Sequence, residues 1–309
     1  MGEAFLSGRS IRTDRVTGEL YSGLGPGPHP GVLILHGSGG AGEYERTYAA
    51  RLAEHGYTAF CVSYFGAPGV SNALAEIPLS RFRDAAEWLL KRPNAAGTQV
   101  GVVGFSRGGE AALLAASHFE RLGAVAAYVP SCYSFPAPTW MAGVEEECAA
   151  WTVDGEPVPY LPVERYVAEQ QDGLTDALEK DAPDASTMAI EGATDERLDE
   201  ATIEVENIEG PVTLISGGSD EVWPSAMLAD RVAERLERHD HPCTVEHRSY
   251  PDAGHAIRVP YRFGGNDPAD GEHRFGGTNR TNAFASADAW YHVLRCLKNG
   301  LDPNGDSRR

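Results

Sequence analysis

The chain has 309 residues, of which 42% are hydrophobic and 9% aromatic, so it can bury a large core and is not a disordered protein. Aspartate and glutamate number 45 against 26 lysines and arginines, a formal net charge of −19, and only three of the basic residues are lysines: Lys91, Lys180 and Lys298. Such a surface repels phosphates, so its charge excludes a nucleic-acid binder and disfavours an anionic membrane as partner. It also suits concentrated salt, where screening lengths fall to a few ångströms, and we expect a halophilic, cytoplasmic protein.

The composition offers no sign of export, membrane insertion or metal binding. Residues 1–10 lack a long apolar run behind a basic segment, and no stretch approaches the ~20 apolar residues of a spanning helix. The cysteines are odd in number, scattered, and never in a C-x-x-C pair: Cys61, Cys132, Cys148, Cys243 and Cys296. This pattern argues against a disulfide framework and a zinc site, and predicts a reducing compartment with no metal or organic cofactor.

The predicted elements alternate along most of the chain. Residues 1–30 are polar, with room for an edge hairpin but not for a domain. Short, mainly apolar runs typical of buried strands occur at 31–35, 57–62, 100–105, 124–129 and 212–216, and a further strand is predicted at 244–250. Helical spacing is found at 43–55, 78–91, 108–119, 225–239 and 283–298. This alternation predicts a mainly parallel α/β sheet with helices on both faces.

One long segment interrupts this alternation. Residues 131–208 are acidic, contain prolines and are only weakly periodic. A connection of that length is typical of an inserted cap or lid. At about 150 residues per domain the length fits two domains or one large one, and we predict a single domain over 1–309 with a cap at 131–208.

The clearest chemical signal is Gly104-Phe105-Ser106-Arg107-Gly108, a G-x-S-x-G sequence between a predicted buried strand and a helix. In a nucleophile elbow the turn is so tight that the serine backbone is strained, and the flanking glycines let neighbouring elements approach closely. An ordinary tight turn is the simpler alternative. The preceding run VGVVGF and the following GGEAALLAAS favour the elbow, with Ser106 as nucleophile.

A serine nucleophile needs a base and a carboxylate that orients the base. His255 follows the predicted strand 244–250 in a glycine-containing loop, and Asp220 follows the strand 212–216. Their order matches the Ser, acid, His order of α/β-hydrolases. Glu221 and Asp252 are the competing carboxylates. Glu221 projects differently from the same turn, and Asp252 is only three residues before the histidine.

Backbone N–H groups should stabilise the oxyanion that forms when the serine attacks a substrate carbonyl. One is expected from Arg107, and the second from the loop His36-Gly37-Ser38-Gly39-Gly40 after the first core strand. Ser38 and Gly39 are both candidates for that second donor. A phosphate-binding turn is the alternative, but the loop lacks the G-x-G-x-x-G and G-K-[ST] patterns.

Other reactive residue types have simpler explanations. Glu110 opens a helix, where a carboxylate interacts favourably with the helix dipole, and Cys132 has no assigned base. Three aromatic residues of the predicted cap could line an acyl pocket, although packing between cap and core is the favoured explanation: Trp140, Trp151 and Tyr160. Three histidines suggest a metal cluster only in the sequence, and we expect them at solvated positions: His239, His241 and His247.

Taken in order, several segments resemble the C-terminal catalytic domain shared by acyl-CoA thioesterases and bile acid-CoA:amino acid N-acyltransferase, a dienelactone-hydrolase-like branch of the α/β-hydrolases. The resemblance spans roughly residues 31–298. Its segments are Ser63-Tyr64-Phe65-Gly66, Glu76-Ile77-Pro78-Leu79, GFSRGGEAALLAAS (104–117), WTVDGEPVPYLP (151–162), IEGPVTLISGGSDEVWPS (208–225), HPCTVEHRSYPDAGH (241–255) and GGTNRTNAFASADAW (276–290).

The resemblance implies an α/β-hydrolase fold and a Ser or Cys nucleophile with Asp and His, which fall on Ser106, Asp220 and His255. It implies a serine hydrolase that cleaves acyl thioesters through an acyl-enzyme, with a small-molecule acyl (thio)ester as its partner. Because the nucleophile is serine, whereas the amino-acid acyltransferase carries cysteine, hydrolysis is favoured over N-acyl transfer. A carboxylesterase acting on small oxygen esters and a non-catalytic binding protein on the same scaffold remain alternatives, and a homo-oligomer is compatible with the sequence.

Overall fold

The computed structural model describes residues 8–163, 184–261 and 275–301. Its main sheet has eight strands in the order β1-β2-β4-β3-β6-β7-β10-β11. The first two are antiparallel to their neighbours, and β4 to β11 run parallel to one another. The strands are β1 (Arg9–Arg12), β2 (Thr17–Tyr21), β3 (His29–Leu35), β4 (Thr58–Val62), β6 (Ala95–Phe105), β7 (Leu122–Tyr128), β10 (Val212–Gly217) and β11 (Val245–Tyr250).

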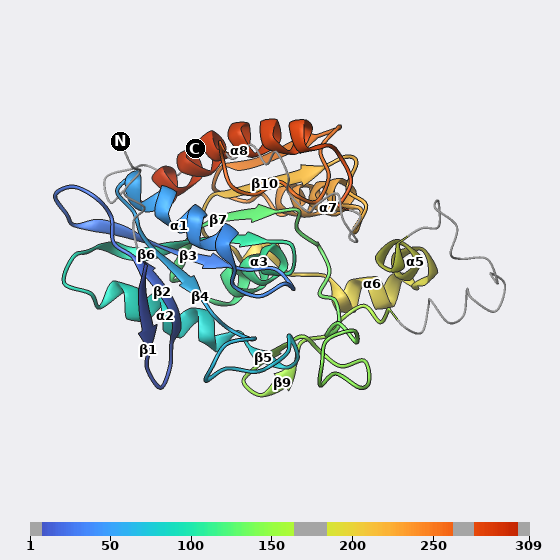
Figure 1. Cartoon of the computed structure of the whole chain (residues 1–309). Coiled ribbons are helices and arrows are strands. Elements are labelled where there is room, and N and C mark those ends of the chain that lie inside the picture. The colour runs from blue at the N-terminus through green and yellow to red at the C-terminus, as the bar shows by residue number, and fades with distance from the viewer. Residues whose placement is uncertain (1–7, 164–183, 262–274, 302–309) are drawn as a thin grey trace.

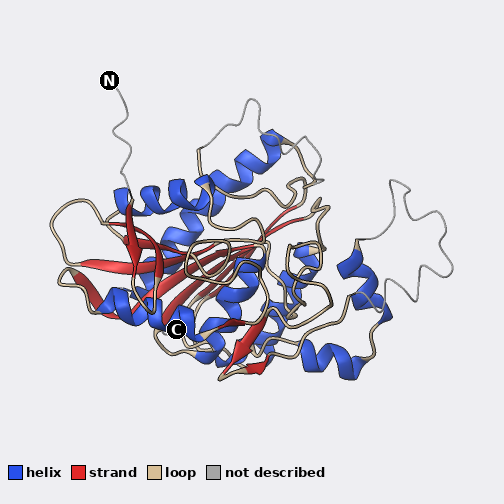
Figure 2. Ribbon diagram, turned by 60° about the horizontal axis from the view of Figure 1, so that its bottom comes forward, coloured by secondary structure: helices blue, strands red, loops and turns tan. Residues whose placement is uncertain are grey.

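Helices cover both faces of this sheet (Figures 1 and 2), as the alternation of elements predicted. On one face lie α1 (Glu43–Glu54) and α8 (Asn279–Leu301), and on the other α2 (Ser80–Leu90), α3 (Arg107–His118) and α7 (Ser225–Arg238). Each face has its own hydrophobic cluster. Strands between two helical layers bury both of their faces, which explains why β7 is buried at all seven residues and reads as a continuous apolar run.

The strand order places a topological switch point between β3 and β6. From β3 the chain continues to β4 on one side, whereas from β6 it continues to β7 on the other. In open parallel sheets, ligands bind where neighbouring connections diverge, outside the carboxyl ends of the strands. The loop after β3 and the turn after β6 therefore meet at the position where such a sheet forms a site.

The region expected to be a cap at 131–208 has structure that the sequence pattern did not predict, and residues 164–183 lie outside the described residues. It contributes two strands of a second, three-stranded sheet, in the order β5-β8-β9. Two short helices lie beyond it, away from the main sheet (Figure 1). The elements are β5 (Ile77–Pro78), which precedes the cap, and β8 (Trp151–Val153), β9 (Glu156–Pro157), α5 (Ala185–Gly192), α6 (Asp195–Ala201) and the 3-10 turn Val205–Asn207.

The structure agrees with one further expectation and differs from another. The polar N-terminal region does form an edge hairpin, β1 with β2. The last helix begins at Asn279 rather than at 283, because the Thr278 hydroxyl accepts a hydrogen bond from the Thr281 N–H and caps the helix earlier. In the described part of the chain no helix combines the length and apolar character that a membrane crossing needs.

Candidate active site

Ser106 lies in a strained turn between β6 and α3. Its backbone has φ 56° and ψ −120°, a conformation that L-residues rarely adopt. The glycines on either side permit this geometry. A Cβ on Gly104 would lie 1.9 Å from the carbonyl oxygen of Gly108, and one on Gly108 would lie 2.3 Å from that of Leu35. The turn presents a partly exposed serine at the carboxyl end of the sheet.

A chain of short hydrogen bonds joins Ser106, His255 and Asp220. His255 Nε2 lies 2.8 Å from Ser106 Oγ, and His255 Nδ1 lies 2.8 Å from Asp220 Oδ2. Because a carboxylate only accepts, Nδ1 carries the proton, and the bare Nε2 accepts the serine hydroxyl. Asp220 also accepts the N–H groups of Val222 and Trp223, which orient its carboxylate. The side chains of His255 and Asp220 are 4% and 1% exposed, so water competes little for either.

The two competing carboxylates are not part of this chain. Both Glu221 and Asp252 are exposed, and within the described residues neither has a hydrogen bond to His255. Asp220 and Glu221 are adjacent in the turn after β10, but only Asp220 faces His255, whereas Glu221 faces solvent.

The segment just before α8 contacts both the loop that carries Asp220 and the loop that carries His255. The His255 N–H donates to the carbonyl of Phe275, and the Gly254 N–H donates to Asn282 Oδ1. Gly276 forms an isolated β-bridge with Asp220, and a Cβ on it would lie 1.8 Å from the Ser219 carbonyl oxygen. Sequence reasoning missed this support, although the Gly276-Gly277 pair before a helix was a signal for close backbone approach.

The loop after β3 lies against the serine. A Cβ on Gly37 would be 3.3 Å from Ser106 Cβ. In the described part of the chain, the N–H groups of Ser38, Gly39 and Arg107 have no hydrogen-bond acceptor, while the Gly40 N–H closes the turn onto Gly37. Donors without a partner beside a nucleophile are what an oxyanion requires.

His36 anchors this loop from below. It is 1% exposed, its Nδ1–H donates to the Gly37 carbonyl, and its ring stacks on Tyr64 with centroids 4.0 Å apart. The Tyr64 hydroxyl in turn donates to the His36 carbonyl. Burial lowers the pKa of His36 to about 4, so the imidazole is neutral near pH 7.

Glu110 lies in the first turn of α3 as expected, but it is fully buried and forms an ion pair instead of a solvated contact with the helix dipole. Its Oε2 is 2.9 Å from Arg107 Nη1, and its Oε1 accepts Trp151 Nε1–H at 2.6 Å and the Phe135 N–H at 3.2 Å. Arg107 Nη2–H donates to the carbonyls of Phe135 and Pro136. Burial raises the pKa of Glu110, and the guanidinium and the two N–H donors oppose that shift.

The aromatic residues of the cap do not share one environment. Trp151 is fully buried between cap and core, as packing predicts. Trp140 is 73% exposed, so core packing is the wrong explanation for it, and Tyr160 is intermediate. Burial raises the pKa of the Cys132 thiol to about 12, which leaves it protonated and unsuited to nucleophilic chemistry.

A second Ser–His–Asp chain occurs between β10, β11 and α7. His247 Nε2 lies 2.7 Å from Ser216 Oγ, and His247 Nδ1 lies 2.8 Å from Asp230 Oδ1. Ser216 is fully buried inside a strand, so no substrate can reach it. These hydrogen bonds link β10 and β11 with α7. Ser106 therefore differs from Ser216 by its exposure at an elbow, not by its hydrogen bonding alone.

The expectation of three solvated histidines is correct for one. His239 is exposed, but His247 is mostly buried, and the half-buried His241 contacts the carbonyl of Gly210 through Nε2. Burial lowers the pKa of both buried rings. Across residues 8–163, 184–261 and 275–301, no group of three His, Cys, Asp or Glu side chains is arranged to hold a metal ion.

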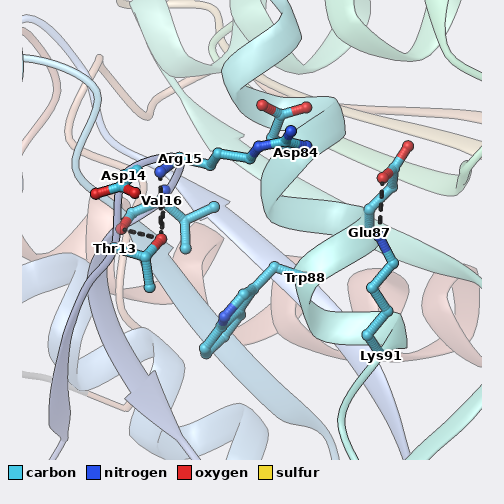
Figure 3. A pocket seen from close by; sticks show the side chains of 8 residues that line it. All are labelled: Thr13, Asp14, Arg15, Val16, Asp84, Glu87, Trp88 and Lys91. Carbon is cyan, nitrogen blue, oxygen red and sulfur yellow. Dashed lines mark hydrogen bonds and ion pairs between the residues drawn. The ribbon is translucent and has the colours of Figure 1, made fainter.

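Two surface hollows differ in their relation to Ser106. One, of about 310 Å³, lies between the β1–β2 turn and α2 (Figure 3), at the opposite end of the sheet from β11. Several of its polar groups already have partners: Lys91 pairs with Glu87, and the Thr13 hydroxyl accepts the Val16 N–H. The other, of about 600 Å³, is lined by Ser38 and therefore borders the loop that lies against Ser106.

Several known proteins are similar in sequence to this chain. The family model described as "BAAT / Acyl-CoA thioester hydrolase C terminal" matches residues 77–303. Acyl-coenzyme A thioesterase 3 of Mus musculus is 28% identical over 300 residues, which are 94% of this chain and 63% of that protein. Acyl-coenzyme A amino acid N-acyltransferase 1 of Mus musculus is 28% identical over 301 residues, 96% of this chain and 65% of that protein. The chain thus spans less than two thirds of the length of these relatives.

Solved structures show the fold. A putative dienelactone hydrolase from Klebsiella pneumoniae superposes with a TM-score of 0.56 at 17% identity, covering 94% of this chain and 97% of that one. An acylaminoacyl peptidase from Pyrococcus horikoshii superposes with a TM-score of 0.59 at 12% identity, covering 99% of this chain and 43% of that one. The predicted α/β-hydrolase fold is confirmed.

Proposed function

Because the chain belongs to the BAAT / acyl-CoA thioester hydrolase C-terminal family, we propose that it hydrolyses acyl thioesters with Ser106 as nucleophile, His255 as base and Asp220 as orienting acid. The observation that carries this proposal is the hydrogen-bond chain from Ser106 Oγ through the imidazole to the Asp220 carboxylate, built on an elbow. The relatives named as acyl-CoA thioesterases support a thioester as the substrate class.

In the first step His255 Nε2 takes the hydroxyl proton while Ser106 Oγ attacks the acyl carbonyl. The resulting oxyanion accepts hydrogen bonds from the Arg107 N–H and from Ser38 or Gly39, each worth ~3 kcal/mol of barrier. The tetrahedral intermediate then expels the thiolate, which receives the proton from Nε2 and leaves an ester on Ser106. Water attacks that ester with His255 again as base, and the carboxylic acid departs.

The second Ser–His–Asp chain provides a matched control for this assignment. Ser106→Ala should lower kcat by about 10⁶-fold, because the nucleophile and the partner of the base are lost together. Ser216→Ala removes the same hydroxyl from a buried structural chain and should retain activity within a few-fold. Thiol release from a panel of acyl-CoAs, beside p-nitrophenyl ester cleavage, measures both in multimolar KCl.

Activity that persists in Ser106→Ala, or disappears only in Ser216→Ala, would refute the assignment. Ester cleavage with silent thioesters would instead support a dienelactone-hydrolase-like enzyme on small oxygen esters. Acyl transfer to glycine in preference to water would support an N-acyltransferase, as in the relative named for that reaction. Failure of a fluorophosphonate probe to label Ser106 would favour a binding protein on a hydrolase scaffold.

A further inference from the structure

An open cleft of about 600 Å³ begins at the loop that contacts the nucleophile. It is lined by Ser38, Phe65, Asn72, Trp140, Met141, Ala142 and Gly143, and we call it the Trp140 cleft. Gly37 packs on Ser106, and the next residue, Ser38, lines the cleft. Phe65 also contacts His36 edge-on, with ring centroids 4.8 Å apart. The cleft therefore borders the loop that lies against Ser106.

The cleft has a buried side, formed by Phe65 and Met141, and an exposed side, formed by Trp140. Phe65 is 5% exposed, and Met141 is 9% exposed with its sulfur accepting the Leu74 N–H. Trp140, in contrast, is 73% exposed. Covering a large exposed aromatic side chain beside a preformed apolar surface with an apolar ligand is favourable, because it removes apolar area from water.

The lining selects the kind of ligand. None of its seven lining residues is charged, and the polar ones are Ser38 and Asn72, in addition to the Trp140 ring nitrogen. The phosphates of a coenzyme A leaving group are bound best by arginine or lysine, and the Trp140 cleft has neither. An uncharged aliphatic chain needs only apolar contact, which this lining provides.

We propose that the Trp140 cleft binds the acyl chain of the substrate and that Trp140 sets the preferred chain length; this rests on the function proposed above. Each methylene that the cleft buries should raise kcat/KM about fourfold, until the chain extends beyond Trp140. The leaving group then departs from the other side of Ser106.

The test is the dependence of kcat/KM on acyl length, from acetyl to dodecanoyl, in two thioester series that differ in leaving group: coenzyme A and N-acetylcysteamine. In Trp140→Ala the slope of log kcat/KM against carbon number should fall by half or more in both series. Tyr291→Ala, which removes a 63% exposed aromatic ring from α8, is the matched control and should keep the wild-type slope.

An unchanged slope in Trp140→Ala would overturn the proposal. So would an equal loss at every chain length that is confined to the coenzyme A series, since the cleft would then hold the leaving group. Calorimetric titration of Ser106→Ala with decanamide, with and without Trp140→Ala, separates the two proposals. If the wild-type protein hydrolyses none of the thioesters, and decanamide binding still depends on Trp140, the proposed function is wrong and the cleft assignment stands. If decanamide does not bind, the cleft assignment fails whatever the activity.

Discussion

At the scale of single residues, His36 shows how burial controls the oxyanion loop. Its Nδ1–H is committed to the Gly37 carbonyl, and in the described part of the chain its Nε2 has no partner. Protonation would place a cation in an apolar site against Tyr64, which explains why the pKa falls to about 4. The loop that should bind an oxyanion thus depends on an imidazole that remains neutral.

This shift predicts an acid-dependent loss of stability. The unfolded chain binds a proton at His36 below about pH 6.5, whereas the folded protein resists it until about pH 4. The stabilisation is therefore complete above pH 6.5 and is lost as the pH falls toward 4, a total of about 3 kcal/mol. Urea unfolding at several pH values should show this loss in wild type and not in His36→Gln. Parallel pH profiles for the two proteins would contradict the prediction.

At the scale of elements, the Arg107–Glu110 pair joins α3 to the segment 131–208. The pair lies in the first turn of α3, and its hydrogen bonds run to the segment after β7 and, through Trp151, to β8. Because the Arg107 N–H is also a proposed oxyanion donor, the position of the cap and the shape of the site are set by the same residue.

Removing the charge of Glu110 leaves the buried guanidinium without its counter-ion. Glu110→Gln should therefore lower the free energy of unfolding by about 3–5 kcal/mol. Glu87→Gln, which breaks a solvent-exposed pair with Lys91 on α2, should cost less than about 1 kcal/mol. Urea midpoints measure both, and similar small losses would show that the buried pair has little structural role.

At the scale of the whole molecule, the excess of 19 negative charges favours expansion. We propose that the protein is adapted to high salt, because the Debye length falls from ~10 Å at 0.1 M to ~3 Å at 1 M and removes this repulsion. The melting temperature should rise from 0.1 M to molar KCl. A double variant, Glu145→Gln with Glu146→Gln, neutralises two adjacent exposed carboxylates and should be more stable than wild type only at low salt. A salt-independent melting temperature would contradict this adaptation.

The sequence by itself predicted the alternating strands and helices around the main sheet, but not the second sheet or the helices within 131–208. It also pointed to Ser106, Asp220 and His255, which the structure joins by hydrogen bonds. Buried parallel strands are continuously apolar, and this pattern marked β6 and β10, which precede Ser106 and Asp220. His255 lies in the loop after the edge strand β11, which is polar and only partly buried. Tertiary structure alone decided which other polar groups are buried together. Glu110 meets Trp151 across 41 residues, Ser216 meets His247 across 31, and Trp140 is left in solvent. The physical reason is that hydrophobic periodicity reports the environment of one element, whereas a pairing between side chains of distant elements depends on how those elements pack.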